Sequence, residues 1–223
     1  MKNWKKAVLF DLDGTLWDST ASVILAWNEV LARYPDTRPV SQEEMKRVMG
    51  FSMDQIGDKL FPYLPKARRE AILRACELHE NEYIGQHGGV LFEGVRPLLE
   101  KLHDQYGIGI VSNCQAGYIE AFLEHYGLQD VVDWTRSFGD FRKEKAENIR
   151  DVMVENHIEQ AVYVGDIAND FLSARQACPS CWQDTGSRRL NTSQRRARWR
   201  ISKRAWTKSC RHIDFFENFR AVQ

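Results

Sequence analysis

Residues 8–16 constrain the fold of this chain most, because a short apolar run there ends in two aspartates one residue apart. Such a run is typical of a fully buried strand, and Gly14 lets the backbone turn away after it. Open α/β sheets bind ligands at the carboxyl ends of their parallel strands. We therefore expect Asp11 and Asp13 to lie in a binding site at the end of a central strand.

The spacing of these two aspartates also indicates a cation beside them. Alternate residues of a strand point to the same face, so Asp11 and Asp13 share a face wherever the backbone stays extended. Two such carboxylates repel each other unless a proton or a cation lies between them. A hard divalent cation such as Mg²⁺ takes oxygen ligands and removes that repulsion. The simpler alternative is a strand followed by an ordinary Asp-Gly turn.

Residues 20–85 carry helical periodicity with no strand signal between the helices. The apolar spacing and the turn residues predict helices over residues 21–34, 41–48, 53–60 and 66–83. The second of these helices opens with a capping-box pattern, in which a serine is followed three residues later by a glutamate. We therefore expect an all-helical segment inserted directly after the first strand.

The pattern changes to alternating helices and strands from residue 94 onward. We expect helices over 94–106, over 117–127 and from the segment 141–149 to about 156, and strands over 108–111, 131–134 and 161–164. Strands that alternate with helices predict an α/β fold with a doubly wound, Rossmann-like parallel sheet.

Polar side chains follow the later strands as well. The strand over 108–111 ends in Ser112 and Asn113, where a hydroxyl and the amides of the turn can donate hydrogen bonds to a phosphate. Two acids four residues apart, Asp166 and Asp170, follow the strand over 161–164 after a glycine. Each piece alone is common as a turn, whereas parallel strands would bring all of them to one edge of the sheet.

These pieces occur in a defined order along the chain. They are DLDGT at 11–15, the strand that ends in Ser112, a lysine just before Ala-Glu-Asn-Ile, and GDIAND at 165–170. In this order they resemble the four motifs of the haloacid dehalogenase-like (HAD) phosphohydrolase superfamily. Lys145 has the better register for the motif lysine, and Lys143 is its competitor. Without the other motifs, a solvated lysine at a helix start would be the commoner interpretation.

The resemblance covers residues 7–177 and implies a division into two parts. Residues 1–16 and 88–177 would form the HAD core, and residues 17–87 a helical cap like that of the phosphoglycolate-phosphatase-like branch. Such a cap closes over the site, excludes water and selects the substrate, and Gly50 lies in the cap segment expected to meet substrate. The alternative is a scaffold bundle that does not contact the substrate.

The resemblance further implies a phosphomonoester phosphatase. Asp11 would attack phosphorus and form an aspartyl-phosphate. Asp13 would protonate the leaving oxygen and later activate the water that frees Asp11. Ser112, Asn113 and Lys145 would hold the transferring oxygens, and the lysine would neutralise the charge of the nucleophile. A phosphosugar mutase shares all of these motifs and remains an alternative.

A magnesium ion is the cofactor that the resemblance implies. Its ligands would be Asp11, the backbone carbonyl of Asp13 and Asp166, together with the phosphate. Asp170 would hold a metal-bound water or the motif lysine. The six histidines form no metal-spaced set, so we expect each of them to be structural or exposed rather than catalytic.

The composition favours a protein of a reduced compartment. No apolar run approaches the length of a membrane span, and the apolar stretch near the N-terminus is too short for a signal peptide. The five cysteines are odd in number and mostly scattered, which fits a compartment without disulfides. We expect a cytoplasmic enzyme whose partner is a small phosphate ester and which does not act at a membrane.

The C-terminal tail, residues 178–223, departs from the pattern of the fold. Residues 1–177 carry 20 basic and 28 acidic side chains, whereas residues 178–212 carry ten basic and one acidic. Where another apolar strand is expected, the chain is instead rich in Arg, Ser, Trp and Cys. We favour a shifted reading frame as the cause, since the segment can be back-translated so that a neighbouring frame encodes an apolar strand and a glycine-rich turn.

Two other interpretations of the tail remain open. Basic residues with interspersed tryptophans can bind nucleic acid through phosphate contacts and stacking, which gives a non-enzymatic alternative for the whole chain. Three cysteines and a histidine could also form a zinc site, namely Cys178, Cys181, Cys210 and His212.

Overall fold

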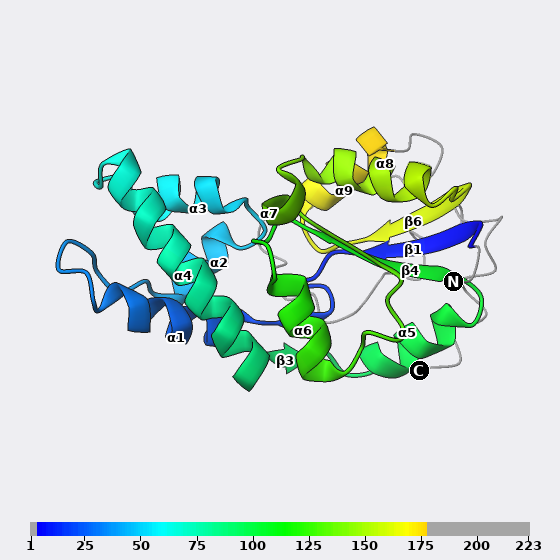
Figure 1. Ribbon diagram of the computed structural model, residues 1–223, viewed down its shortest axis with the longest axis horizontal. Coiled ribbons are helices and arrows are strands. Elements are labelled where there is room, and N and C mark those ends of the chain that lie inside the picture. The colour runs from blue at the N-terminus through cyan, green and yellow to red at the C-terminus, as the bar shows by residue number, and fades with distance from the viewer. Residues whose placement is uncertain (1–3, 178–223) are drawn as a thin grey trace.

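A parallel sheet built around β1 (Lys6–Phe10) organises the computed structural model, which describes residues 4–177 (Figure 1). Within these residues the strand order is β5 (Trp134–Ser137), β4 (Gly107–Ser112), β1 and β6 (Gln160–Val164), and every neighbouring pair is parallel. The predicted α/β fold with a doubly wound parallel sheet is confirmed. In the described part of the chain, β6 forms one edge of the sheet.

The side chains of β1 divide the core into two layers. Val8 and Phe10 pack into the larger apolar cluster, whereas Ala7 and Leu9 pack into the smaller one. This alternation follows from the two-residue period of a strand, and it requires apolar cover on both faces of the sheet. The near-continuous apolar sequence of β1 is therefore the signature of a central parallel strand.

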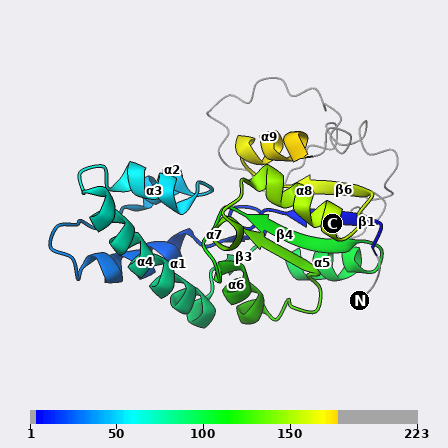
Figure 2. The ribbon, with the colours of Figure 1, turned by 45° about the horizontal axis from the view of Figure 1, so that its top comes forward.

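Helices supply that cover on both faces (Figures 1 and 2). The first face carries α5 (Val95–His103) and α6 (Tyr118–Tyr126), and the opposite face carries α8 (Lys145–Glu155) and α9 (Ala168–Ala177). A short helix, α7 (Phe138–Phe141), which the sequence did not predict, follows β5.

The strand predicted over 131–134 is misplaced, because β5 begins only at Trp134. The side chain of Asp133 accepts a hydrogen bond from the backbone N–H of Ile108 at 2.8 Å, and its own N–H donates to the carbonyl of Ile108 at 2.8 Å. These two bonds hold Asp133 at the entrance of the strand, so the valines before it pack as a loop. The absence of a side chain at Gly107 leaves room for Trp134 at the start of β5, because a Cβ at position 107 would lie 2.3 Å from its ring.

Four helices form a second part of the molecule, beside the sheet (Figure 1). They are α1 (Thr20–Leu31), α2 (Gln42–Val48), α3 (Met53–Leu60) and α4 (Lys66–His87). All four lie close to their predicted positions, and Ser41 with Glu44 forms the predicted capping box. The long helix runs four residues past the predicted end, to His87, and the Gly88 that follows it has a φ of +65°, which favours glycine.

Two very short strands connect the helical part to the sheet. β2 (Trp17–Asp18) and β3 (Val90–Leu91) pair antiparallel, where the chain leaves the sheet part and where it returns. The sequence did not indicate them, because two residues are too few to show a strand period. No helix in residues 4–177 is both long enough and apolar enough to cross a membrane. The interpretations of the tail concern residues outside the described range.

An acid is buried in the middle of this helical part. Glu80 of α4 is only 4% exposed and accepts a hydrogen bond from the indole N–H of Trp27 on α1. Burial raises the pKa of Glu80 to about 8, although hydrogen bonds from Trp27 and Gln115 oppose the shift, and nearby Asp13 and Glu77 add to it. The folded protein therefore keeps a proton that the unfolded chain releases near the ordinary pKa of 4.5.

We expect this proton to make the fold less stable as the pH rises. From about pH 4.5 to 8 the folded state binds the extra proton, so the free energy of unfolding falls, by on the order of a few kcal/mol. In a Glu80→Gln variant this part of the fall is absent, and the variant is more stable than the wild type at pH 8. Urea unfolding at pH 5, 6.5 and 8 measures the difference.

The matched control is Glu82→Gln, which makes the same change at an exposed position of the same helix. This control is expected to follow the wild-type pH dependence. Identical pH slopes for the wild type and Glu80→Gln would contradict the prediction.

Candidate active site

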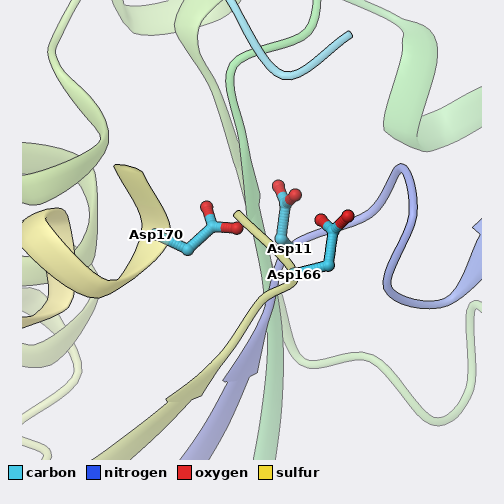
Figure 3. Close-up of side chains that lie close together, drawn as sticks. All are labelled: Asp11, Asp166 and Asp170. Carbon is cyan, nitrogen blue, oxygen red and sulfur yellow. The ribbon is translucent and has the colours of Figure 1, made fainter. Parts of the chain in front are cut away.

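Three aspartates from separate segments meet at the carboxyl edge of the sheet (Figure 3). Asp11 directly follows β1, Asp166 lies in the turn after β6, and Asp170 lies in the first turn of α9. Each offers a carboxylate oxygen, and these three oxygens all lie within 4.8 Å of one another. Asp11 and Asp170 are buried, whereas Asp166 is exposed. The parallel strands thus bring together acids that are more than 150 residues apart in the sequence.

Lys145, the first residue of α8, lies against two of these acids. Its Nζ is 2.9 Å from Asp11 Oδ1 and 2.6 Å from Asp170 Oδ1, and the side chain is only 1% exposed. Burial opposes its charge, but the two carboxylates hold the pKa of Lys145 well above its usual value. Lys143, the competing candidate, instead makes a surface ion pair with Asp151 at 2.5 Å. The structure therefore brings Lys145 to the acids and leaves Lys143 outside.

The charges in this cluster do not balance. Burial raises the pKa of Asp11 to about 7, with Lys145 opposing the shift and Asp170 and Asp13 adding to it. Partial burial and the charge of Asp170 raise the pKa of Asp166 to about 6. When all of these groups are ionised, one ammonium faces three carboxylates, and negative charge is in excess. A divalent cation with oxygen ligands would neutralise that excess. The donor set therefore fits a metal site.

Asp13 forms its side-chain hydrogen bonds with residues outside this cluster. Backbone hydrogen bonds from Thr15 and Leu16 to the carbonyl of Leu12 close a turn, so extended geometry does not persist through the motif. The carboxylate of Asp13 accepts hydrogen bonds from Ser19 Oγ at 2.5 Å and from Tyr118 Oη at 2.9 Å. The sequence predicted a shared face only where the backbone stays extended, and this turn interrupts that geometry. The two aspartates nevertheless line one cavity.

Gly14 makes the close approach of the acids possible. Its φ of +80° favours glycine, and a Cβ at this position would lie 2.5 Å from Asp166 Oδ2. Any side chain here would push Asp166 away from Asp11. The glycine of the motif thus has a steric role as well as a role in the turn.

The predicted phosphate-binding residues lie beside the aspartates. Ser112 ends β4 and is 5% exposed. The side-chain amide of Asn113 donates a hydrogen bond to the carbonyl of Gly50 at 2.9 Å, which joins the sheet part to the helical part. All three residues line one cavity together with Asp11 and Asp13.

The remaining walls of this cavity come mostly from the helical part. They include apolar side chains of α1, α2 and α3, among them Trp27, Met45 and Ile56. Two polar residues that the sequence analysis did not single out, Glu80 and Gln115, also line it. Neither belongs to a recognisable motif. Glu80 reaches the cavity from α4, and Gln115 reaches it from the segment between β4 and α6.

Comparisons with known proteins identify relatives of this chain. A model of the haloacid dehalogenase-like hydrolase family matches residues 8–181. The phosphoglycolate phosphatase of Xanthomonas campestris pv. campestris is 28% identical over 185 residues, which cover 77% of this chain and 79% of that protein. The phosphoglycolate phosphatase of Vibrio cholerae is 27% identical over 183 residues, which cover 77% and 80%.

Solved structures share the fold at lower sequence identity. CbbY from Rhodobacter sphaeroides, solved in complex with phosphate, is 20% identical with a TM-score of 0.67, over 78% of this chain and 83% of that chain. A haloacid dehalogenase-like family hydrolase from Streptococcus pneumoniae is 21% identical with a TM-score of 0.65, over 79% and 82%. The fold is that of an α/β protein with a helical insertion, and the matching family model is one of hydrolases. The chain belongs to the haloacid dehalogenase-like hydrolase family.

We expect Lys145 to stabilise the folded protein when no metal ion is bound. A Lys145→Met variant leaves two buried carboxylates without their cation, which is expected to lower the free energy of unfolding by about 3–5 kcal/mol. Urea unfolding at pH 7.5 in the presence of EDTA measures this loss.

The control is Lys143→Met, which removes a half-exposed partner of a surface ion pair. Surface pairs contribute little, so this control is expected to change stability by less than about 1 kcal/mol. Equal effects of the two substitutions would show that burial of the Lys145 ion pairs does not stabilise the fold.

Proposed function

We propose that this protein is a magnesium-dependent phosphatase that hydrolyses a small phosphate monoester through an aspartyl-phosphate on Asp11. The observation that carries the proposal is the placement of Lys145 between Asp11 and Asp170, with Asp166 beside them, at the carboxyl edge of a parallel sheet. Family membership and the phosphatases among the relatives support the same reaction class.

In this proposal Asp11 is the nucleophile. One of its carboxylate oxygens attacks phosphorus, and the bond from phosphorus to the leaving oxygen breaks. The ammonium of Lys145, 2.9 Å from Asp11 Oδ1, reduces repulsion between the attacking carboxylate and the phosphate. The hydroxyl of Ser112 and the amides of the turn after it donate to the transferring oxygens.

Asp13 is the general acid and base in this proposal, on the side of the phosphorus opposite Asp11. Its carboxyl gives a proton to the leaving oxygen, and its carboxylate then takes a proton from the water that attacks the aspartyl-phosphate. This attack breaks the bond to Asp11 and releases inorganic phosphate. Ser19 and Tyr118 hold the Asp13 carboxyl in one orientation, and burial raises its pKa although these hydrogen bonds oppose the shift.

Asp11, Asp166 and the backbone carbonyl of Asp13 would hold Mg²⁺, and Asp170 would support the site through Lys145. The ion would supply charge that offsets the phosphate and the acids. The helical part, residues 17–87, would act as the cap. Support for this role comes from the hydrogen bond between Asn113 and the carbonyl of Gly50, which holds the two parts against each other beside the acids.

A reduced, cytoplasmic location belongs to the same proposal. The free cysteines of the described chain, Cys76 and Cys114, are both buried and form no disulfide. Burial raises the pKa of the Cys76 thiol, so this group stays protonated and unreactive. These features are typical of a protein that functions without disulfides.

The direct test is a screen of small phosphate esters with and without Mg²⁺. The proposal predicts release of inorganic phosphate that requires Mg²⁺. Transfer of the phosphoryl group back to a sugar, without phosphate release, would instead indicate the mutase alternative. Absence of turnover with every ester, in a folded protein, would contradict the proposal.

We expect two variants to separate binding from proton transfer. Asp13→Asn keeps the backbone carbonyl, so Mg²⁺ should still raise its melting temperature, while turnover falls by at least about 100-fold. Asp11→Asn removes a ligand and the nucleophile, so both the Mg²⁺ effect and turnover should be lost.

The control for these variants is Asp130→Asn, an exposed position after α6 that is expected to retain both properties. Near-normal turnover in Asp13→Asn would remove Asp13 as the proton donor.

A further inference from the structure

We propose that Glu80 is a specificity-determining residue, which selects phosphate esters whose alcohol part carries an uncharged hydroxyl group and disfavours those that carry a carboxylate. The inference rests on the proposed phosphatase function and names the class of substrate for that site.

The first support is the position of Glu80. It lines the same cavity as Asp11 and Asp13, but it belongs to α4 in the helical part. A phosphate held at Asp11 would direct its alcohol part into the cavity, towards the walls that this part provides. Glu80 is therefore placed to meet the alcohol part of the substrate rather than its phosphate.

The second support is that neighbouring side chains hold Glu80 in place. The indole N–H of Trp27 donates to its carboxyl group, and Gln115 forms a further hydrogen bond with it. Gln115 in turn donates to the side chain of Asn81 at 3.1 Å, and Asn81 donates to the backbone carbonyl of Ala116 at 2.7 Å. A buried carboxyl group that is fixed in this way can recognise a ligand with little loss of conformational freedom.

The third support is the charge of the cavity. Among its described lining residues there are three acids, Asp11, Asp13 and Glu80, and no lysine, arginine or histidine. A carboxylate on the substrate would enter an apolar, acidic space without a cationic partner, which is costly. A hydroxyl group can both donate to and accept from the Glu80 carboxyl group, so its hydrogen bonds with water are replaced.

An ammonium group is a weaker match for the same position. Burial raises the pKa of Glu80 to about 8, so its carboxyl group is mostly uncharged near neutral pH. An ammonium would lose its water without meeting a full negative charge on Glu80. The hydroxyl group is therefore the best partner among the three.

The test compares three esters of similar size, which differ only in the end of the alcohol part. They are 2-hydroxyethyl phosphate, 2-phosphoglycolate and phosphoethanolamine, with p-nitrophenyl phosphate as a general substrate. For the wild-type enzyme with Mg²⁺, we expect kcat/KM for the hydroxyl ester to exceed that for the carboxylate ester at least about tenfold. Groups that titrate in the common reaction cancel in this ratio.

The variant Glu80→Gln tests the residue itself. At pH 8.5 most of the Glu80 carboxyl groups have lost their proton and repel a carboxylate, whereas an amide stays neutral and can donate a hydrogen bond to it. At this pH the ratio should therefore fall to within about threefold in the variant. The change should lie in the ratio between the hydroxyl ester and the carboxylate ester. Glu82→Gln, the exposed control on the same helix, should keep the wild-type ratio.

Each outcome decides the inference. Equal or faster turnover of 2-phosphoglycolate or phosphoethanolamine by the wild type would overturn it, and so would an unchanged ratio in Glu80→Gln. In those cases the phosphatase function itself would stand. Absence of turnover with all four esters would overturn both the proposed function and the inference. If Glu80→Gln does not fold, the wild-type ratio alone still decides.

Discussion

The ion pairs of Lys145 with Asp11 and Asp170 are the interaction on which the candidate site depends. Acids from three segments can lie this close only because a buried ammonium partly offsets their repulsion. The sheet provides the framework, since β1 and β6 are neighbouring parallel strands and end at the same edge. The acids still carry more negative charge than Lys145 offsets, and a cation at this edge of the sheet would neutralise it. The packing of the fold thereby determines the chemistry of the site.

The helical part and the sheet part have different tasks in this arrangement. The sheet edge holds the acids, whereas the cavity above them is largely walled by apolar side chains of α1, α2 and α3. Contacts such as Asn113 with Gly50, and Tyr118 with Asp13, cross between segments that are far apart in the sequence. Glu80 of α4 adds a buried polar group to this cavity, and in the proposed function it meets the alcohol part of the substrate.

Much of the fold was predictable because its elements are long and regular. The buried strands β1, β4 and β6 are unbroken apolar runs, and the helices α1 to α4 show clear apolar spacing. The elements that were missed or misplaced are short: β2 and β3 have two residues each, and α7 has four. The position of β5 was wrong because Asp133 fixes the entrance of that strand through bonds to Ile108, and no local pattern reveals such a contact.

The sequence alone determined the order of the strand-end motifs, the α/β fold, the helical insertion and the identity of Asp11, Asp166 and Asp170 as candidates. It did so because these features depend on local periodicity and on spacing along the chain. Only the tertiary structure placed Lys145, and not Lys143, against the acids, joined Asp13 to Ser19 and Tyr118, and buried Glu80 at the cavity. These outcomes depend on which distant side chains meet once the helices pack, and hydrogen bonding and burial act there rather than in the local sequence.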